Sequence, residues 1–142
     1  MPWTPPQRIR ALAIAIIREG DRLLVMEGRD ESLARTFYRP LGGGVEFGER
    51  AEAAVRRELR EEIGAELTNV AYVAMIENLY ELEGHPGHEI VFVYTAELAD
   101  RALYERETFT IEEANGRAIW ISIADARSGG VSLVPKELVA LL

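Results

Sequence analysis

The chain has 142 residues and a formal net charge of -8, which argues against a nucleic-acid polymer as the main partner, because a phosphate backbone calls for a basic surface. Its length suits one domain, residues 1–142, and the lack of cysteine excludes disulfides, thiolate zinc sites and a cysteine nucleophile. No apolar stretch is long enough to span a bilayer and no secretion signal is evident, so we expect a cytoplasmic protein without a membrane partner.

Two apolar segments near the N-terminus predict a strand hairpin. Residues 9–17 and 22–26 are rich in aliphatic side chains, and Glu19-Gly20-Asp21 between them is typical of a turn. The first segment contains little polarity, so we expect it to be covered on both faces, as in a layered sandwich. Residues 27–39 carry charges without periodicity, and we predict a loop there.

The glycines of residues 40–44, Pro-Leu-Gly-Gly-Gly, permit a tight turn or a close approach of the backbone to phosphate or metal. A helix over residues 50–64 follows. Apolar side chains recur in it every four residues and form one stripe, and Gly64 is well placed as a C-terminal stop. The stripe consists of Ala51, Val55, Leu59 and Ile63.

Three glutamates of this helix predict a divalent-metal site. At roughly 100° per residue, Glu58 lies beside the apolar stripe, Glu61 lies further round the flank, and Glu62 points toward the core. A carboxylate on the core side is costly unless a cation or strong donors compensate it, and Glu58 repels Glu62 across one turn. Magnesium or manganese would resolve both problems and suggests phosphoryl or pyrophosphoryl transfer. The alternative is a solvated acidic helix face, since interleaved arginines would pair with these glutamates.

The second half of the chain predicts further strands and two short helices. The β-favouring segments are residues 67–82, 88–98 and 118–123, and the hairpin loop Glu83-Gly84-His85-Pro86-Gly87 joins the first two. Residues 124–128 predict a short helix and residues 135–142 a final one. Strands on both sides of a central helix indicate an α/β fold with a mixed sheet between helical layers.

The segment from Gly43 to Ala65 resembles the Nudix box, G-x5-E-x7-R-E-U-x-E-E-x-G-U, in which U is aliphatic. Gly43, Glu49 and the run from Arg57 to Gly64 match every fixed position, and the one departure is Ala65, where Ile, Leu or Val is usual. A match of this length on a strand-loop-helix pattern is highly specific. The resemblance implies a Nudix hydrolase domain with an α/β/α sandwich and a mixed β-sheet.

The resemblance also implies roles for the residues of the box. Glu58 and Glu62 would bind magnesium, with manganese accepted by the same oxygen ligands, and the carbonyl oxygen of Gly43 would be a further ligand. Glu61 would be a ligand or the general base. Arg57 would orient a neighbouring glutamate.

Further charged candidates lie around the box. Some family members add a glutamate from a loop ahead of a late tryptophan-bearing strand, which points here to Glu112 or Glu113 before Trp120. An exposed acid is the alternative for each. Glu49 would support the loop or a second metal, and Arg39, beside the glycines, is a candidate for binding phosphate.

Three aromatic residues are candidates for stacking on a nucleobase, with the core as the alternative place for each. They are Tyr38, Phe47 and Tyr80. His85 and His88 flank Pro86-Gly87 and are candidates for a phosphate contact or an auxiliary base, and polar loop residues are the simpler interpretation.

The resemblance predicts a magnesium-dependent enzyme that hydrolyses a pyrophosphate bond in a small nucleotide, a nucleoside diphosphate linked to a group X. The short chain favours a MutT-like nucleoside triphosphate pyrophosphatase. An ADP-ribose or nucleotide-sugar pyrophosphatase is the alternative within the enzyme class. A non-catalytic nucleotide-sensing module is the alternative outside it, although such modules typically lose glutamates of the box. A homodimer would follow the habit of the family.

Overall fold

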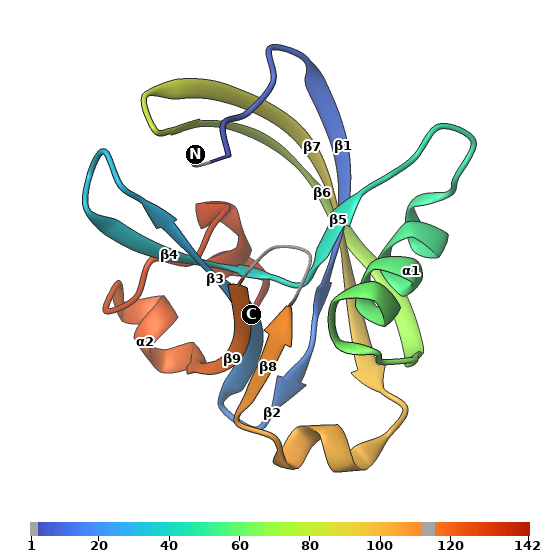
Figure 1. Cartoon of the computed structure of the whole chain (residues 1–142). Coiled ribbons are helices and arrows are strands. Elements are labelled where there is room, and N and C mark those ends of the chain that lie inside the picture. Colours follow the sequence, from blue (N-terminus) through green and yellow to red (C-terminus); the bar gives the residue numbers. More distant parts are fainter. Residues whose placement is uncertain (1–2, 112–115) are drawn as a thin grey trace.

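A computed structural model describes residues 3–111 and 116–142 (Figure 1). The strands are β1 (Ile9–Ile16), β2 (Arg18–Glu19), β3 (Arg22–Asp30), β4 (Arg35–Pro40), β5 (Gly42–Gly44), β6 (Leu67–Leu82), β7 (His85–Leu98), β8 (Thr108–Ile111) and β9 (Gly116–Ser122). The α-helices are α1 (Ala51–Ile63) and α2 (Ile123–Ser128), and the 3₁₀ helices are η1 (Arg101–Glu105) and η2 (Lys136–Leu141). The predicted final helix is therefore a 3₁₀ helix.

The strands form two sheets. The first has the order β5-β1-β7-β6, and it is mixed because β1 runs parallel to β7 while the other pairs are antiparallel. The second is antiparallel, with the order β2-β3-β9-β8 and β4 also paired with β3. One core contains side chains of α1 and the other contains side chains of α2 and η2, and both contain side chains of the two sheets. The predicted α/β fold with a mixed sheet and flanking helices is confirmed.

Strand β1 is buried on both faces, as predicted, but its partners differ from the prediction. Its alternate side chains enter the two cores, Ala13 and Ala15 on one side and Ile14 and Ile16 on the other. The predicted hairpin of residues 9–17 with residues 22–26 is wrong, because β1 lies between β5 and β7 and both of its edges are used. From this part of the chain, β2 pairs with β3 around the predicted turn, and the N–H of Leu24 donates to the carbonyl oxygen of Ile17 at 3.0 Å.

Two predicted loops are largely strand. Residues 27–39 form the end of β3 and most of β4, which pair around the turn of residues 31–34. The charges mask this pattern because β4 is a strand whose side chains remain mostly half-exposed. The predicted loop of residues 83–87 shrinks to the turn Glu83-Gly84, whose φ values of 53° and 76° are typical of two-residue hairpin turns.

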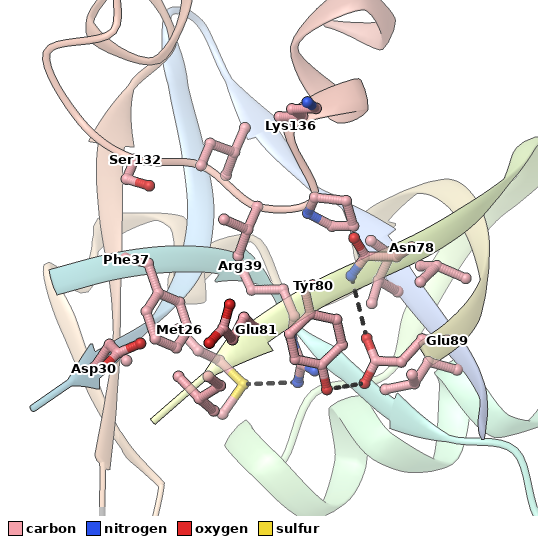
Figure 2. Close-up of a pocket in the computed structure, with 18 of the residues that line it drawn as sticks. Met26, Asp30, Phe37, Arg39, Asn78, Tyr80, Glu81, Glu89, Ser132 and Lys136 are labelled. Carbon is pink, nitrogen blue, oxygen red and sulfur yellow. Dashed lines mark hydrogen bonds between the residues drawn. The ribbon is translucent and has the colours of Figure 1, made fainter. Parts of the chain in front are cut away.

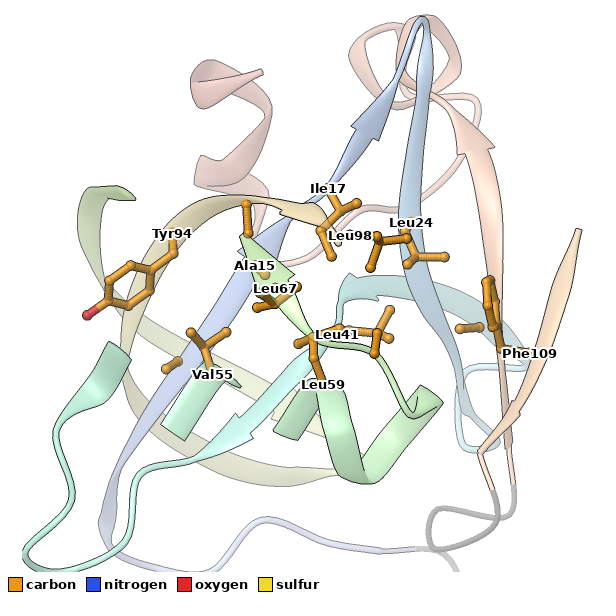
Figure 3. Packing of buried hydrophobic residues seen from close by; sticks show 14 of the residues in the cluster. Ala15, Ile17, Leu24, Leu41, Val55, Leu59, Leu67, Tyr94, Leu98 and Phe109 are labelled. Atoms are coloured by element: carbon orange, nitrogen blue, oxygen red, sulfur yellow. The ribbon is translucent and has the colours of Figure 1, made fainter. Parts of the chain in front are cut away.

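Helix α1 has the predicted bounds and the predicted buried side. Val55 and Leu59 are fully buried against the two sheets (Figure 3). Gly64 ends the helix in the left-handed conformation, with φ 66°, and its N–H donates to the carbonyl of Arg60 at 2.9 Å. Within the described ranges, no helix has the length and apolar character needed to cross a membrane.

Candidate active site

The glycines after β4 form a strand instead of a turn, and this strand holds a glutamate of α1. Gly42 has φ +146°, and any Cβ there would collide with the backbone of β1, so only glycine fits. Its N–H donates to Oε1 of Glu62 at 3.0 Å. Burial raises the pKa of Glu62 to about 8; the charge of Arg39 opposes this rise and that of Glu58 adds to it. Glu62 thus faces inward, as its place in the helix predicts.

Arg57 holds the other carboxylates together. Its guanidinium donates to both oxygens of Glu49, at 2.8 and 2.9 Å, to Glu58 at 2.9 Å and to Glu61 at 3.2 Å. It also donates to the carbonyl oxygen of Gly44 at 2.9 Å. The bonds from Arg57 lower the pKa of Glu49 to about 2, and the partner carboxylates raise the pKa of Arg57. One side chain therefore fixes the first turns of α1 to the segment that precedes it.

The carboxylate of Glu58 lies against the backbone of Gly43. A Cβ at position 43 would stand 2.5 Å from Cδ of Glu58 and 2.7 Å from each of its oxygens. The absence of a side chain at Gly43 is what leaves room for the carboxylate. The structure therefore brings Gly43, Glu58, Glu61 and Glu62 together, with Arg57 between two of the glutamates.

This oxygen-rich cluster fits a hard dication. Glu62 is a partly buried carboxylate with one backbone donor and a like-charged neighbour in Glu58, and a cation would offset both unfavourable effects. No group of three acidic or histidine side chains in residues 3–111 and 116–142 has the arrangement of a finished metal site. Glu58 and Glu61 each have one oxygen bonded to Arg57, Oε1 and Oε2 respectively, and among the described hydrogen bonds their other oxygens remain available to an ion.

A cavity of about 750 Å³ opens between the two sheets (Figure 2). Its wall combines aromatic, cationic and acidic side chains. They include Trp3, Phe37, Tyr80, Arg10, Arg35, Arg39, Lys136, Asp30 and Glu89. A cavity of this size and mixed lining suits a ligand with a ring system and charged groups.

Arg39 connects the cavity with the carboxylate cluster. It lines the cavity and donates to the carbonyl oxygen of Gly42 at 3.4 Å, next to the bond between Gly42 and Glu62. Its charge opposes the rise in pKa of both Glu62 and Tyr80, so the guanidinium lies within electrostatic reach of both. This is a suitable place for a phosphate between a bound metal and a bound ring.

The turns of two hairpins from different sheets are bonded to each other at the edge of the cavity. Asp30 accepts a hydrogen bond from the N–H of Glu83 at 3.2 Å. Glu83 in turn accepts from the N–H of Glu31 at 2.6 Å and from that of Ser32 at 3.2 Å. We call this reciprocal arrangement of Asp30 and Glu83 the turn clasp. It ties the β3–β4 turn to the β6–β7 turn.

The structure separates the predicted aromatic candidates. Tyr80 lines the cavity, and burial raises its pKa to about 12, so that its hydroxyl stays protonated. Tyr38 is not among the lining residues and packs against the second core. Phe47 is fully exposed and does not line the cavity either. Phe37, the neighbour of Tyr38, is the aromatic residue of β4 that lines it.

The remaining candidates lie away from the cavity or outside the described part of the chain. His85 is exposed at the start of β7 and His88 is half-buried on the same strand, and neither lines the cavity. Glu112 and Glu113 fall outside the residues that the structure describes. Their assignment to the metal remains a prediction.

Glu89 is a buried acidic residue of the cavity that sequence reasoning missed. It is buried, with 7% of its surface exposed, and accepts hydrogen bonds from Arg10, Asn78 and Tyr80. The available signal was one acidic residue at the start of the apolar segment 88–98, on a strand expected to be buried. Its partners lie on β1 and β6 and become visible only in the folded chain.

Comparison with known sequences gives one family and several partial relatives. Residues 6–142 match the NUDIX domain. The chain is 29% identical over 140 residues to the mitochondrial NAD(P)H pyrophosphatase NUDT13 of Mus musculus, which covers 92% of this chain and 36% of that protein. It is 38% identical over 66 residues to the NAD-capped RNA hydrolase NudC of Pseudomonas putida strain W619, covering 46% of this chain and 23% of that protein. The chain thus spans about a third or less of the length of these relatives.

Solved structures show the same fold. A putative nudix hydrolase family member from Chromobacterium violaceum has a TM-score of 0.65 at 22% identity and covers 96% of this chain and 76% of its own. The MutT NUDIX hydrolase from Burkholderia pseudomallei has a TM-score of 0.62 at 21% identity, covering 83% of this chain and 86% of its own. At these identities the likeness concerns the arrangement of helices and strands.

Proposed function

Because this chain belongs to the NUDIX family, we propose that it is a divalent-metal-dependent pyrophosphohydrolase acting on a nucleoside diphosphate linked to a group X. The observation that carries the proposal is the cluster of Glu58, Glu61 and Glu62 beside Gly43, organised by Arg57. Arg39 continues this cluster into a cavity large enough for a nucleotide. Oxygen ligands, a cationic phosphate contact and a ring-lined cavity are the parts that diphosphate hydrolysis needs.

Each residue of the cluster has a proposed role. Glu58, Glu62 and the carbonyl oxygen of Gly43 would hold magnesium, or manganese with the same ligands. The bound ion would neutralise the diphosphate and acidify the attacking water. Glu61 is the more exposed carboxylate and the proposed general base, since a base must reach solvent-derived water.

Two arginines would position the reacting groups. Arg57 holds Glu58 and Glu61 at fixed places relative to each other, so its role is positioning. Arg39 would bind a phosphate oxygen of the substrate, because its guanidinium already lies between the cavity and Glu62. Glu49 would keep Arg57 in place through its bidentate bond.

Two substrate classes are proposed for X. The first is a nucleoside triphosphate, cleaved by a MutT-like reaction. The second is a dinucleotide of the NAD(P)H type, which is favoured by the mouse relative, an NAD(P)H pyrophosphatase that aligns with nearly the whole chain. ADP-ribose and nucleotide sugars contain the same diphosphate linkage and belong in the same assay.

An assay with magnesium tests the proposal. Nucleoside triphosphates including 8-oxo-dGTP, NADH, ADP-ribose and nucleotide sugars would be incubated with the protein, and phosphate would be measured after a coupling phosphatase. Metal-dependent turnover of one class is expected, and Glu61→Gln and Glu62→Gln should abolish it. Glu52→Gln is the matched control, because Glu52 lies on the same helix and pairs only with exposed Arg56 among the described contacts. A metal-independent background with every substrate would overturn the proposal and favour a nucleotide-sensing module.

A further inference from the structure

The buried carboxylate of Glu89 on the cavity wall can accept a further hydrogen bond. Oε2 of Glu89 accepts two hydrogen bonds, from Nη1 of Arg10 at 3.2 Å and from the hydroxyl of Tyr80 at 3.1 Å. Oε1 has only the contact from Nδ2 of Asn78 at 3.5 Å, which is long for a hydrogen bond. A carboxylate has about four lone-pair positions, so Oε1 retains the ability to accept a bond from a ligand.

The surroundings of Glu89 make such a bond strong and selective. Leu12, Ile14 and Val91 line the same cavity and, like Glu89, are buried. A hydrogen bond to a buried charged acceptor is stronger than one in water, and a ligand without the matching donor leaves the acceptor unpaired. Arg10 and Tyr80 both donate to Oε2 of the carboxylate and so restrict its rotation; the bond from Tyr80 is drawn in Figure 2.

Two rings from opposite sheets line the same cavity as this carboxylate. Phe37 of β4 packs on Gly28 of β3, where a Cβ would stand 2.5 Å from its ring. Tyr80 of β6 covers Gly87 of β7 in the same way, with a Cβ 2.2 Å from its ring. Each ring is therefore held flat over a glycine, and both rings reach into the cavity (Figure 2). Rings placed in this way are suited to stacking on a planar base.

We propose that Glu89 determines specificity by accepting, through Oε1, an N–H on the edge of a base that stacks on Phe37 and Tyr80. The ligand class is a nucleotide whose heteroaromatic base carries an amino group, and a base without that group is disfavoured. This inference rests on the proposed function insofar as the ligand is a nucleotide. It adds the residue that reads the base.

Pairs of nucleotides that differ by one amino group test the inference. Guanosine and inosine monophosphates form one pair, and adenosine and purine-riboside monophosphates form the other, and binding in the presence of magnesium would be measured by calorimetry. In at least one pair, the nucleotide with the amino group should bind at least roughly tenfold more tightly than its partner without it. This is the affinity difference that a hydrogen bond to a charged acceptor usually produces. Equal binding within both pairs, or no binding by any of the four, would overturn the inference without the need for a variant.

The Glu89→Gln variant separates base recognition from a purely structural role of Glu89, because only base recognition predicts a change in the ratio of the two affinities within a pair. Arg10 and Tyr80 both donate to the same atom, so the amide oxygen must take that position. The amide nitrogen then occupies the position of Oε1 and presents a donor to the donor of the base. Affinity for the amino-bearing nucleotide should fall about tenfold, while affinity for its amino-free partner stays unchanged. An unchanged ratio in the variant would contradict the inference.

Two further variants separate this effect from others. Glu97→Gln is the matched control, because exposed Glu97 lies on β7 as well and accepts a bond from Asn69 of β6. It should leave the ratio unchanged. Phe37→Leu removes a stacking ring, so both members of a pair should bind roughly tenfold more weakly with the ratio retained. If the protein hydrolyses nucleotides but binds both members of each pair equally, the inference about Glu89 is wrong and the proposed function stands. If it binds the amino-bearing nucleotides more tightly but hydrolyses no substrate, only the proposed activity is wrong.

Discussion

Gly43 shows how a missing side chain places a carboxylate. Its Cα faces the carboxylate of Glu58, which occupies the space that a Cβ would take. We expect Gly43→Ala to fold, because the end of a flexible side chain can move, but to displace Glu58. A displacement of about 1 Å in a catalytic group can lower the rate on the order of 100-fold. Turnover with magnesium would measure the loss.

The neighbouring glycine provides the control for this substitution. A Cβ on Gly44 would meet nothing nearer than Nη2 of Arg10, at 4.0 Å. Gly44→Ala should therefore retain far more turnover than Gly43→Ala. Equal losses in the two variants would show that backbone stiffness, and not the room left for Glu58, governs the site.

We expect the carboxylate of Glu62 to destabilise the protein when no metal is bound. Its carboxylate is partly buried beside Glu58 and has one backbone donor, so ionisation there is unfavourable and removal of the ionisable group relieves this cost. We expect Glu62→Gln to raise the Tm of the metal-free protein and to reduce the further increase that magnesium produces in the wild type. Thermal unfolding with a chelator and with magnesium measures both effects. A lower metal-free Tm would contradict this account.

The inward orientation of Glu62 could be predicted from the sequence, because helical periodicity is local and places residue 62 near the line of Val55 and Leu59. The same reasoning put Glu58 beside the stripe and Glu61 further out. The contact between Glu58 and Gly43 and the fourfold role of Arg57 could not be derived from periodicity. They depend on how closely β5 approaches α1, which is a property of the folded backbone.

At the scale of elements, the turn clasp joins hairpins that lie far apart in the sequence. Asp30 ends β3 and Glu83 begins the turn after β6, and each carboxylate accepts backbone N–H groups of the other turn. The clasp therefore bonds the edges of two different sheets. It fixes the opening of the cavity at that end.

Asp30 should give the clasp a dependence on pH. The hydroxyl of Ser32, with the backbone N–H groups of Glu83 and Leu33, lowers the pKa of Asp30 below its ordinary value of 3.8. A lowered pKa in the folded state means stabilisation that is complete above pH 3.8 and is lost as the pH falls below it. Asp30→Asn should be less stable than the wild type at neutral pH and equally stable in strong acid. Urea unfolding at both pH values is the measurement, and a difference that persists in acid would refute the role of the charge.

The elements with local signals were the predictable ones. Helix α1 carries its apolar stripe and its terminal Gly64 in consecutive residues, and the structure has both. The hairpin of β3 with β4 lacks such a signal, because Arg35 and Arg39 interrupt the apolar alternation of a half-exposed strand. The parallel pairing of β1 with β7 joins segments about 80 residues apart, and no local pattern specifies it.

At the scale of the whole molecule, two cores share the same strands. Leu23 and Leu24 are adjacent on β3 and both fully buried. Leu23 nevertheless enters the core with α2 and η2, whereas Leu24 enters the core with α1, which Figure 3 shows. Since each core contains side chains from both sheets, neither core should unfold alone.

Substitution of these two leucines tests that expectation. Leu23→Ala and Leu24→Ala should each lower the free energy of unfolding by about 2–5 kcal/mol. Unfolding should remain a single transition in both variants, with tryptophan fluorescence and circular dichroism changing together. Two separate transitions in either variant would show that the cores are independent.

The layered arrangement could be anticipated from the order of strands and helices, but the split into two sheets could not. The split places the cavity between the sheets. Within one of these sheets, Arg10 of β1 and Asn78 and Tyr80 of β6 flank Glu89 of the central strand β7. Contacts of this kind depend on which strands are neighbours and on their register, and a local pattern of residues contains no information about either.

The order of strands β5-β1-β7 sets the distance between Gly43, a proposed metal ligand, and Glu89, the proposed base contact, and with it the position at which the proposed reaction would cut a phosphate chain. Gly43 lies opposite Ala13, Ala13 lies opposite Phe92, and Glu89 lies three residues before Phe92 on the same strand. At ordinary strand spacings, Gly43 and Glu89 are therefore separated by roughly 10 Å across the sheet and 10 Å along it. Hydrogen-bonded neighbouring strands do not slide, so this separation is constant. When nucleotides with progressively longer phosphate chains are supplied, the cut should stay at the same phosphorus counted from the base, and only the released fragment should lengthen.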